Sequence, residues 1–279
     1  MGFIDHIHAC NNHDLTRFVP FYAPNGQQIG WVRQDKLSLL TGFEKLLEIT
    51  GQSVSIRPCQ DLTAAMAQVT TALRDQGVLE NWRDEPYEVK ASFAEKPLFL
   101  MERAATAFFG IRAFGVHING YVRRPDGFYM WIAKRAFDRA ICPGMLDNMV
   151  AGGQPAGLSL MDNIIKECGE EANVPEQLAR TTQSVGMISY MMETDGGIKP
   201  DVMFCYDLEV PADFIPENTD GEVESFSLMS VEEVAEIVRT SFEFKFNCNL
   251  VVIDFLLRHG VIMPDDCADY EALVRGLRQ

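Results

Sequence analysis

Apolar and polar residues alternate along several short stretches of this chain, which is the pattern of strands with one buried face. Two such stretches lie within residues 17–33, RFVPFYAPNGQQIGWVR, on either side of Asn25-Gly26. Because Asn-Gly readily adopts the positive φ of a tight turn, this segment is predicted to form a β-hairpin.

Helical spacing of apolar residues follows in residues 35–49, DKLSLLTGFEKLLEI, and predicts a helix there. A short strand at 53–57, SVSIR, then leads into a second predicted helix at 61–77. Asp61 can cap that helix and Gly77 can end it. These elements together predict a small α/β module that closes near residue 110.

The next part of the chain is richer in β-forming residues. Residues 112–124 and 127–136 predict a hairpin around the turn Pro125-Asp126-Gly127. Alternation and helical spacing then predict three further strands and three C-terminal helices. The strands are expected at 184–194, 202–210 and 223–229, and the helices at 230–240, 249–260 and 269–277.

The charge balance restricts what the protein can bind. Its 279 residues carry 24 Lys and Arg against 40 Asp and Glu, a formal net charge of −16. No nucleic-acid partner is expected, because that balance leaves no basic footprint, and a phosphorylated substrate would be accompanied by a divalent cation.

No stretch approaches the roughly 20 apolar residues of a membrane span, and residues 1–12 lack the features of a signal peptide. A cytoplasmic protein without a membrane partner is expected.

The seven cysteines are scattered and include no Cys-x-x-Cys pair. An odd, scattered set predicts neither a disulfide framework nor a zinc ribbon, and reduced thiols fit the cytoplasmic expectation. The sequence leaves the oligomeric state, a homodimer included, open.

The strongest chemical signal lies in residues 150–174, VAGGQPAGLSLMDNIIKECGEEANV. On a helix with about 100° per residue, Glu167, Glu170 and Glu171 fall on one face. Upstream glycines predict a flexible loop that lets the backbone approach a ligand closely. These glycines are Gly152, Gly153 and Gly157, and the apolar face beside the glutamates holds Met161, Ile165, Cys168 and Ala172.

Three glutamates at this spacing repel one another, so the helix gains from a bound cation. Mg²⁺ prefers oxygen ligands and is usually held by one or two carboxylates together with substrate phosphates. A Mg²⁺ or Mn²⁺ site at Glu167, Glu170 and Glu171 is therefore one interpretation. The alternative is an acidic helix face that contacts only solvent.

The same segment resembles the Nudix box, which runs Gly, five residues, Glu, seven residues, and then Arg-Glu-apolar-any-Glu-Glu-any-Gly-apolar. The positions that match are Gly152, Glu167, Glu170, Glu171 and Val174. Three positions depart from the pattern. Leu158 replaces the first Glu, which mainly supports the loop, Lys166 replaces Arg, and Asn173 replaces Gly. The metal-binding half of the pattern is intact.

Other stretches are similar to a thiamine pyrophosphokinase-related branch of the Nudix hydrolases. They read FGVHINGYV at 114–122, MWIAKRA at 130–136, CPGMLDNMVAGG at 142–153 and FLLRHGVIMPDD at 255–266. Members of that branch carry an N-terminal extension, which corresponds to the module predicted at 1–110.

The resemblance implies a Nudix α/β/α sandwich with a mixed sheet in residues 111–279, extended by C-terminal helices, and an α/β accessory domain in residues 1–110. It implies a pyrophosphatase that uses Mg²⁺ or Mn²⁺ to convert a small-molecule substrate, thiamine diphosphate or its oxidised or damaged forms, to the monophosphate. Two alternatives stay open. One is hydrolysis of nucleoside diphosphate derivatives such as ADP-ribose or NADH, and the other is a catalytically idle module that only binds a metabolite.

Nudix enzymes often recruit another acidic residue from a late strand or loop, as base or as metal ligand. Glu222 and Glu224 are two apart and would share a side of an extended segment, and Glu224 is closest to the family position. With Glu170 they are the candidate catalytic residues.

Candidate substrate-binding residues are His117, Lys134, Arg135, Gly152 and Gly153. Lys134 and Arg135 end a strand that leads toward the glycines, where cations could hold diphosphate oxygens. His117 lies in an apolar strand, so it is either a substrate contact or a core residue. Trp82 either stacks on a flat heterocycle or anchors the interface between the two modules.

Overall fold

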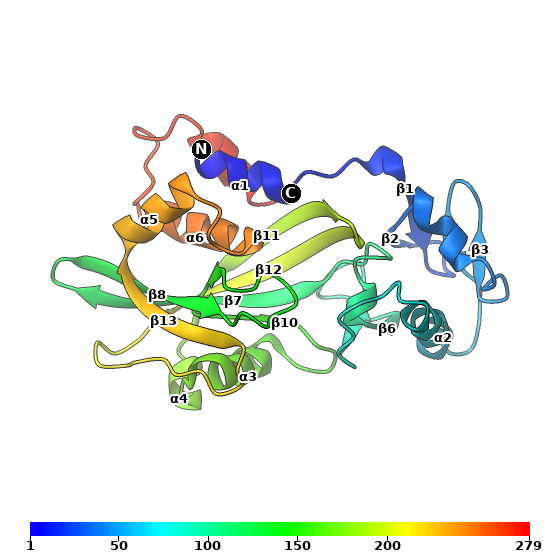
Figure 1. Ribbon diagram of the computed structural model, residues 1–279, viewed down its shortest axis with the longest axis horizontal. Coiled ribbons are helices and arrows are strands. Elements are labelled where there is room, and N and C mark those ends of the chain that lie inside the picture. The colour runs from blue at the N-terminus through cyan, green and yellow to red at the C-terminus, as the bar shows by residue number, and fades with distance from the viewer.

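A seven-stranded mixed sheet lies at the centre of the computed structural model, which describes residues 1–279 (Figure 1). Five strands follow one another in the order β11-β12-β7-β8-β13, while β10 pairs with β7 and β9 pairs with β8. Strands β12 and β7 are parallel and the other pairs are antiparallel. The strands are β7 (Phe114–Arg124), β8 (Gly127–Arg135), β9 (Leu146–Asp147), β10 (Val150–Gly153), β11 (Gln183–Thr194), β12 (Gly197–Glu209) and β13 (Val223–Ser230).

Helices cover both faces of this sheet (Figure 1). On one face, Ile164 and Cys168 of α3 pack into a core with Val116 and Ile118 of β7. On the other face, a larger core gathers side chains of the first helix and of the last three. The fold is an α/β/α sandwich with a mixed sheet, so the predicted fold class is confirmed. The helices are α3 (Leu160–Ala172) and α4 (Glu176–Ala179) on the first face, and α1 (Phe3–Cys10), α5 (Val231–Thr240), α6 (Phe246–Arg258) and α7 (Tyr270–Gly276) on the second.

Residues before β7 build a separate core of 20 buried side chains, among them Phe21, Met66 and Phe109. A four-stranded sheet of order β2-β1-β4-β3 and a two-stranded sheet of β5 and β6 contribute to it, together with α2. These elements are β1 (Phe18–Tyr22), β2 (Gln28–Arg33), β3 (Leu47–Ile49), β4 (Val54–Ile56), α2 (Leu62–Asp75), β5 (Pro86–Val89) and β6 (Phe99–Glu102), with 3₁₀ turns η1 (Leu15–Arg17), η2 (Gln34–Leu40) and η3 (Arg103–Ala105).

Local signals in this N-terminal part were read correctly at the hairpin and at α2. Strands β1 and β2 pair antiparallel, and Asp61 caps α2 by accepting a hydrogen bond from the Ala64 N–H at 2.9 Å. The helix predicted over 35–49 is wrong, since the segment forms η2, a turn and then β3. Gly42, at φ +103°, breaks the helical path, and Leu47 is buried through strand pairing with β4 instead.

The first helix does not pack with the N-terminal core. Ile7 and Cys10 of α1 are buried among residues of α6 and α7, although α1 belongs to residues 1–110 in sequence. The two parts of the chain are also joined by backbone hydrogen bonds, such as Ile198 N–H to the Ala107 carbonyl at 3.0 Å. None of the helices is both long and apolar enough to cross a membrane.

Candidate functional site

Helix α3 is fixed at both ends by local contacts. The Ser159 side chain caps its first turn by accepting from the Asp162 N–H at 3.2 Å, and Asn173 ends it in the left-handed conformation at φ +51°. Asn tolerates that conformation, so the replacement of the family's Gly at 173 keeps the helix end. The carboxylate-bearing face of α3 is therefore held in a defined place against β10.

The loop from β10 to α3 is braced even though Leu158 replaces the family's first Glu. Gln154 donates to the Leu158 carbonyl at 2.8 Å, and Asn163 donates to the Gly153 carbonyl at 2.8 Å and to the Gln154 side chain at 3.2 Å. Two side-chain amides thus hold the loop in this chain.

Gly152 and Gly153 lie in strand β10, not in the flexible loop that was predicted. Their lack of a side chain is used for close packing. A Cβ on Gly152 would overlap the Glu167 carboxyl, and a Cβ on Gly153 would overlap the Tyr87 hydroxyl. The two glycines therefore bring α3, and a tyrosine from β5, directly onto the strand.

Glu171 is the most deeply buried of the three glutamates, with 8% of its surface exposed. One oxygen accepts the Ala151 N–H at 2.8 Å. Burial raises its pKa well above the usual value, and the nearby carboxylates of Asp147, Glu167 and Glu222 raise it further. A buried acid with three acidic neighbours is a favourable position for a cation, although the buried Lys245 ammonium is also close enough to interact with it.

Glu167 lies beside β10 with 12% of its side chain exposed, and burial raises its pKa despite the nearby ammonium of Lys166. Lys166 reaches Glu167 at 3.2 Å and Glu170 at 2.7 Å. Glu170 is half exposed and forms that ion pair at the surface. The structure thus separates the predicted trio into two largely buried carboxylates, Glu167 and Glu171, and one half-exposed carboxylate, Glu170.

Oxygen donors at Glu167 and Glu171 fit a hard divalent ion such as Mg²⁺, because both carboxylates are desolvated and Glu171 forms no ion pair. Another group, His117, Asp147 and Cys248, brings its ligand atoms within 4.8 Å of one another. That group does not fit a metal. Asp147 already pairs with Arg135 at 2.8 Å and lies 3.6 Å from the Lys245 ammonium, and burial raises the pKa of the Cys248 thiol.

His117 lies inside the protein, 4% exposed, and its Nδ1 is 2.9 Å from the Asn148 side chain. Burial lowers its pKa to about 4. This placement favours the interpretation of His117 as a core residue over that of a substrate contact. The Arg135 guanidinium already has partners within the protein, because it pairs with Asp147 and donates to the Ile141 and Cys142 carbonyls. Lys134 lies over the Phe137 ring at 5.2 Å.

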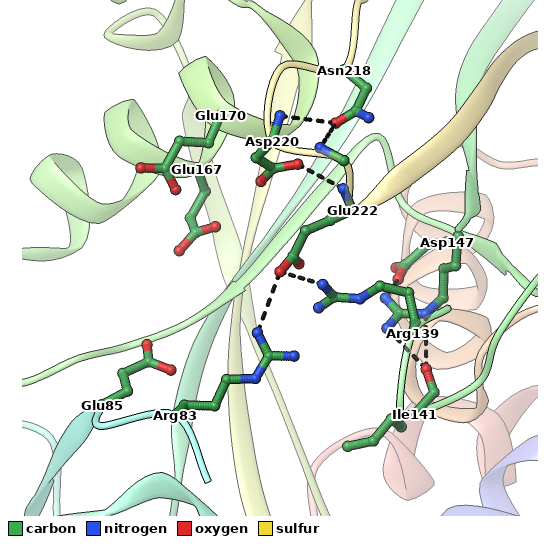
Figure 2. A network of polar contacts seen from close by, with 12 residues as sticks. Arg83, Glu85, Arg139, Ile141, Asp147, Glu167, Glu170, Asn218, Asp220 and Glu222 are labelled. Atoms are coloured by element: carbon green, nitrogen blue, oxygen red, sulfur yellow. Dashed lines mark hydrogen bonds and ion pairs between the residues drawn. The ribbon is translucent and has the colours of Figure 1, made fainter. Parts of the chain in front are cut away.

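Glu222 and Glu224 do not share a side, contrary to the prediction. A β-bulge between Val223 and Ser225 shifts the pairing of β13 with β8, so the alternation expected of an extended segment fails at Glu224. Glu224 is exposed, whereas Glu222 points toward the glutamates of α3 and forms ion pairs with Arg83 and Arg139 (Figure 2).

The sequence interpretation missed several residues that the fold brings to this site. Figure 2 shows Arg83 and Glu85 from the loop before β5, Arg139 from the loop after β8, and Asp220 from the loop before β13, all around Glu167 and Glu222. In the run Trp82-Arg83-Asp84-Glu85, the sequence suggests a role in binding for the Trp alone. Trp82 packs on the N-terminal core and donates to Asp84 at 2.7 Å. The neighbours that face the site are Arg83 and Glu85 (Figure 2).

Comparisons with known proteins are consistent with this geometry. The family described as "Domain of unknown function (DUF4743)" matches residues 2–113. The chain is 40% identical to "Nudix hydrolase 20, chloroplastic" of Arabidopsis thaliana over 99% of its own length and 78% of that protein. It is 40% identical to "Nudix hydrolase 24, chloroplastic" of the same plant, with the same two coverages. The cytoplasmic expectation is contradicted, because both of these relatives are chloroplastic proteins.

Among solved structures, the chain is similar to the Nudix domain of Shewanella oneidensis NrtR complexed with ADP-ribose. The TM-score is 0.43 at 12% identity, and the match covers 54% of this chain and 90% of that one.

Proposed function

Because this chain belongs to the Nudix hydrolase family and is a diphosphate hydrolase, we propose that it converts thiamine diphosphate, or oxidised or damaged forms of it, to the monophosphate. The observation that carries the chemistry is the pair Glu167 and Glu171, desolvated side by side at β10 with acidic neighbours. The thiamine ring is proposed from the stretches at 114–122, 142–153 and 255–266 that resemble the thiamine-related branch.

Glu167 and Glu171 would hold Mg²⁺ or Mn²⁺, with Glu170 joining them once Lys166 is released. The bound ion would polarise phosphate oxygens and lower the pKa of the attacking water. Glu222 is proposed as the base that takes the proton of that water, because it points into the site while Glu224 stays exposed. Gly152 and Gly153 keep β10 close to the reacting phosphate.

Residues 111–279 are proposed as the Nudix hydrolase domain with its helical extension, and residues 1–110 as an accessory domain. The accessory part would affect substrate choice, since Tyr87, Arg83 and Glu85 reach the site from it. The proposed boundary is drawn along the sequence, and α1, which lies within residues 1–110, packs with α6 and α7 of the other part.

A substrate panel tests the proposal. Initial rates of substrate cleavage, followed by chromatography of the monophosphate products, are measured at low substrate concentration with Mg²⁺, with Mn²⁺ and with EDTA. We expect thiamine diphosphate or its oxidised form to have a kcat/KM at least tenfold above ADP-ribose and NADH, and no turnover in EDTA. A tenfold preference for ADP-ribose or NADH would reject the thiamine assignment. Metabolite binding without turnover of any compound would identify an idle module.

A further inference from the structure

Two arginines converge on a single carboxylate oxygen at the edge of the site. Arg83 lies 3.5 Å from Glu222 Oε1, and Arg139 pairs with the same atom (Figure 2). Each guanidinium carries five N–H donors, so one carboxylate oxygen leaves most of them without a partner. Two positive charges therefore face the single negative charge of Glu222.

Arg139 has a hydrogen-bond donor without a partner. Its side chain is only 15% exposed, and its Nε is buried without any hydrogen-bond partner. A buried donor of a charged group without an acceptor is costly, and such groups in native proteins call for an explanation. An anion with several oxygens, placed beside Glu222, would supply the missing acceptor.

The loop that carries Arg83 is built to present it. The backbone N–H groups of Arg83 and Glu85 donate to the two oxygens of Glu102 at 3.1 and 3.0 Å. Asn81 and Asp84, on either side, have positive φ of 58° and 55°. Left-handed residues of this kind persist where the surrounding structure over-determines them, often at ligand sites.

We propose that Arg83 and Arg139 bind the terminal phosphate of the diphosphate substrate, taking its oxygens in place of the Glu222 carboxylate. This rests on the proposed diphosphate hydrolysis. Guanidinium groups match phosphate oxygens in bidentate geometry, and two of them suit a terminal phosphate with two negative charges better than an internal phosphodiester. The substrate class is thus a diphosphate with a free terminal phosphate, and releasing Glu222 leaves it free to act on water.

The other account of the same geometry is structural. Arg83 would then anchor the N-terminal module to β13 through Glu222 and would touch no ligand. The two accounts differ in what happens when Glu222 is removed. A phosphate-binding Arg83 still contributes to ligand affinity in the Glu222→Gln protein, whereas an anchoring Arg83 contributes nothing once its partner is gone.

The test measures the affinity of full-length protein for methylenediphosphonate, a non-hydrolysable diphosphate, with Mg²⁺ by calorimetry. The variants are Arg83→Gln, Arg139→Lys, Glu222→Gln and the double variant Arg83→Gln/Glu222→Gln. Arg57→Gln is the matched control, because Arg57 is an exposed arginine of the same module that donates to the Glu44 carbonyl. It follows β4, which belongs to the N-terminal core and not to the core that contains α3.

We expect Arg83→Gln to weaken binding at least tenfold, Arg139→Lys at least threefold, and Arg57→Gln less than twofold. The loss from Arg83→Gln should persist, at threefold or more, in the Glu222→Gln background. An Arg83→Gln protein within twofold of wild type, or a loss that vanishes when Glu222 is absent, overturns the proposal. So does a wild-type protein that turns over thiamine diphosphate yet does not bind the probe. Absence of turnover on every diphosphate of the panel would instead remove the proposed function.

Discussion

At the scale of single residues, Glu171 combines burial with three acidic neighbours, Asp147, Glu167 and Glu222. Replacing it by Gln keeps an oxygen to accept the Ala151 N–H and removes a desolvated charge. We expect Glu171→Gln to raise the free energy of unfolding of the metal-free protein by about 1 kcal/mol. Urea denaturation in EDTA measures it. Glu170→Gln is the control, because Glu170 is half exposed and paired with Lys166, and a metal-free Glu171→Gln protein less stable than wild type would contradict the account.

His117 gives the stability a defined pH dependence. Burial lowers its pKa from 6.5 to about 4, so between those values the unfolded chain binds a proton that the folded protein excludes. Stability is therefore lost as the pH falls through this window. Between pH 7 and pH 5 the expected loss from this residue is about 2 kcal/mol. Urea denaturation at the two pH values measures the free energy of unfolding, and its fall from pH 7 to pH 5 should be smaller by that amount in His117→Gln than in wild type. An equal fall in the two proteins would show that His117 is not the cause.

The sequence could place Glu167 and Glu171 together, because one helical period determines which residues share a face. It could not show that Lys166 draws Glu170 to the surface, since that depends on which carboxylate is desolvated against β10. The bulge between Val223 and Ser225 could not be predicted from the sequence either, because a one-residue shift in strand pairing does not change the alternation of apolar and polar residues in β13.

At the scale of elements, alternation and turn residues predicted the hairpins well, because the buried face of each strand and the glycines of each turn are local features. The segment 35–49 was misread as one helix. Its apolar spacing suits a helix, yet Gly42, at positive φ, interrupts the helical path. The end of the segment forms β3 because it pairs with β4, a strand that lies outside the segment.

The close approach of β10 to α3 yields a paired prediction. Gly152→Ala places a methyl group against the Glu167 carboxyl and should lower Mg²⁺-dependent turnover at least tenfold by displacing that ligand. Gly169→Ala is its matched control within α3, where a Cβ meets nothing within 4 Å. It should keep wild-type turnover and stabilise the protein by about 0.5–1 kcal/mol. Equal turnover in Gly152→Ala and wild type would show that Glu167 need not lie against β10.

At the scale of the whole molecule, the two ends of the chain complete one core. Ile7 and Cys10 of α1 are buried against α6 and α7, and the Ser189 N–H donates to the Leu277 carbonyl at 3.1 Å. Deleting residues 1–11 should therefore lower the free energy of unfolding by at least about 3 kcal/mol, since two buried apolar side chains are lost. Thermal denaturation measures this effect. A deletion protein with unchanged stability would show that α1 is dispensable for this core.

The assembly of the site is the feature least accessible from sequence. Glu167, Glu222, Arg139 and Arg83 come from four separate segments, and only the folded sheet brings them together (Figure 2). Motif spacing reveals residues within one helix, so the carboxylates of α3 could be predicted and the arginines could not.

The central claim is that Glu167 and Glu171 hold the divalent ion on which hydrolysis depends. The most direct measurement is the turnover of Glu171→Gln on the best diphosphate of the panel with saturating Mg²⁺, with circular dichroism to show that the fold is intact. Because Gln lacks the anionic oxygen that Mg²⁺ requires, we predict a loss in kcat of at least about a hundredfold. Near-wild-type turnover by a folded Glu171→Gln protein would contradict the claim.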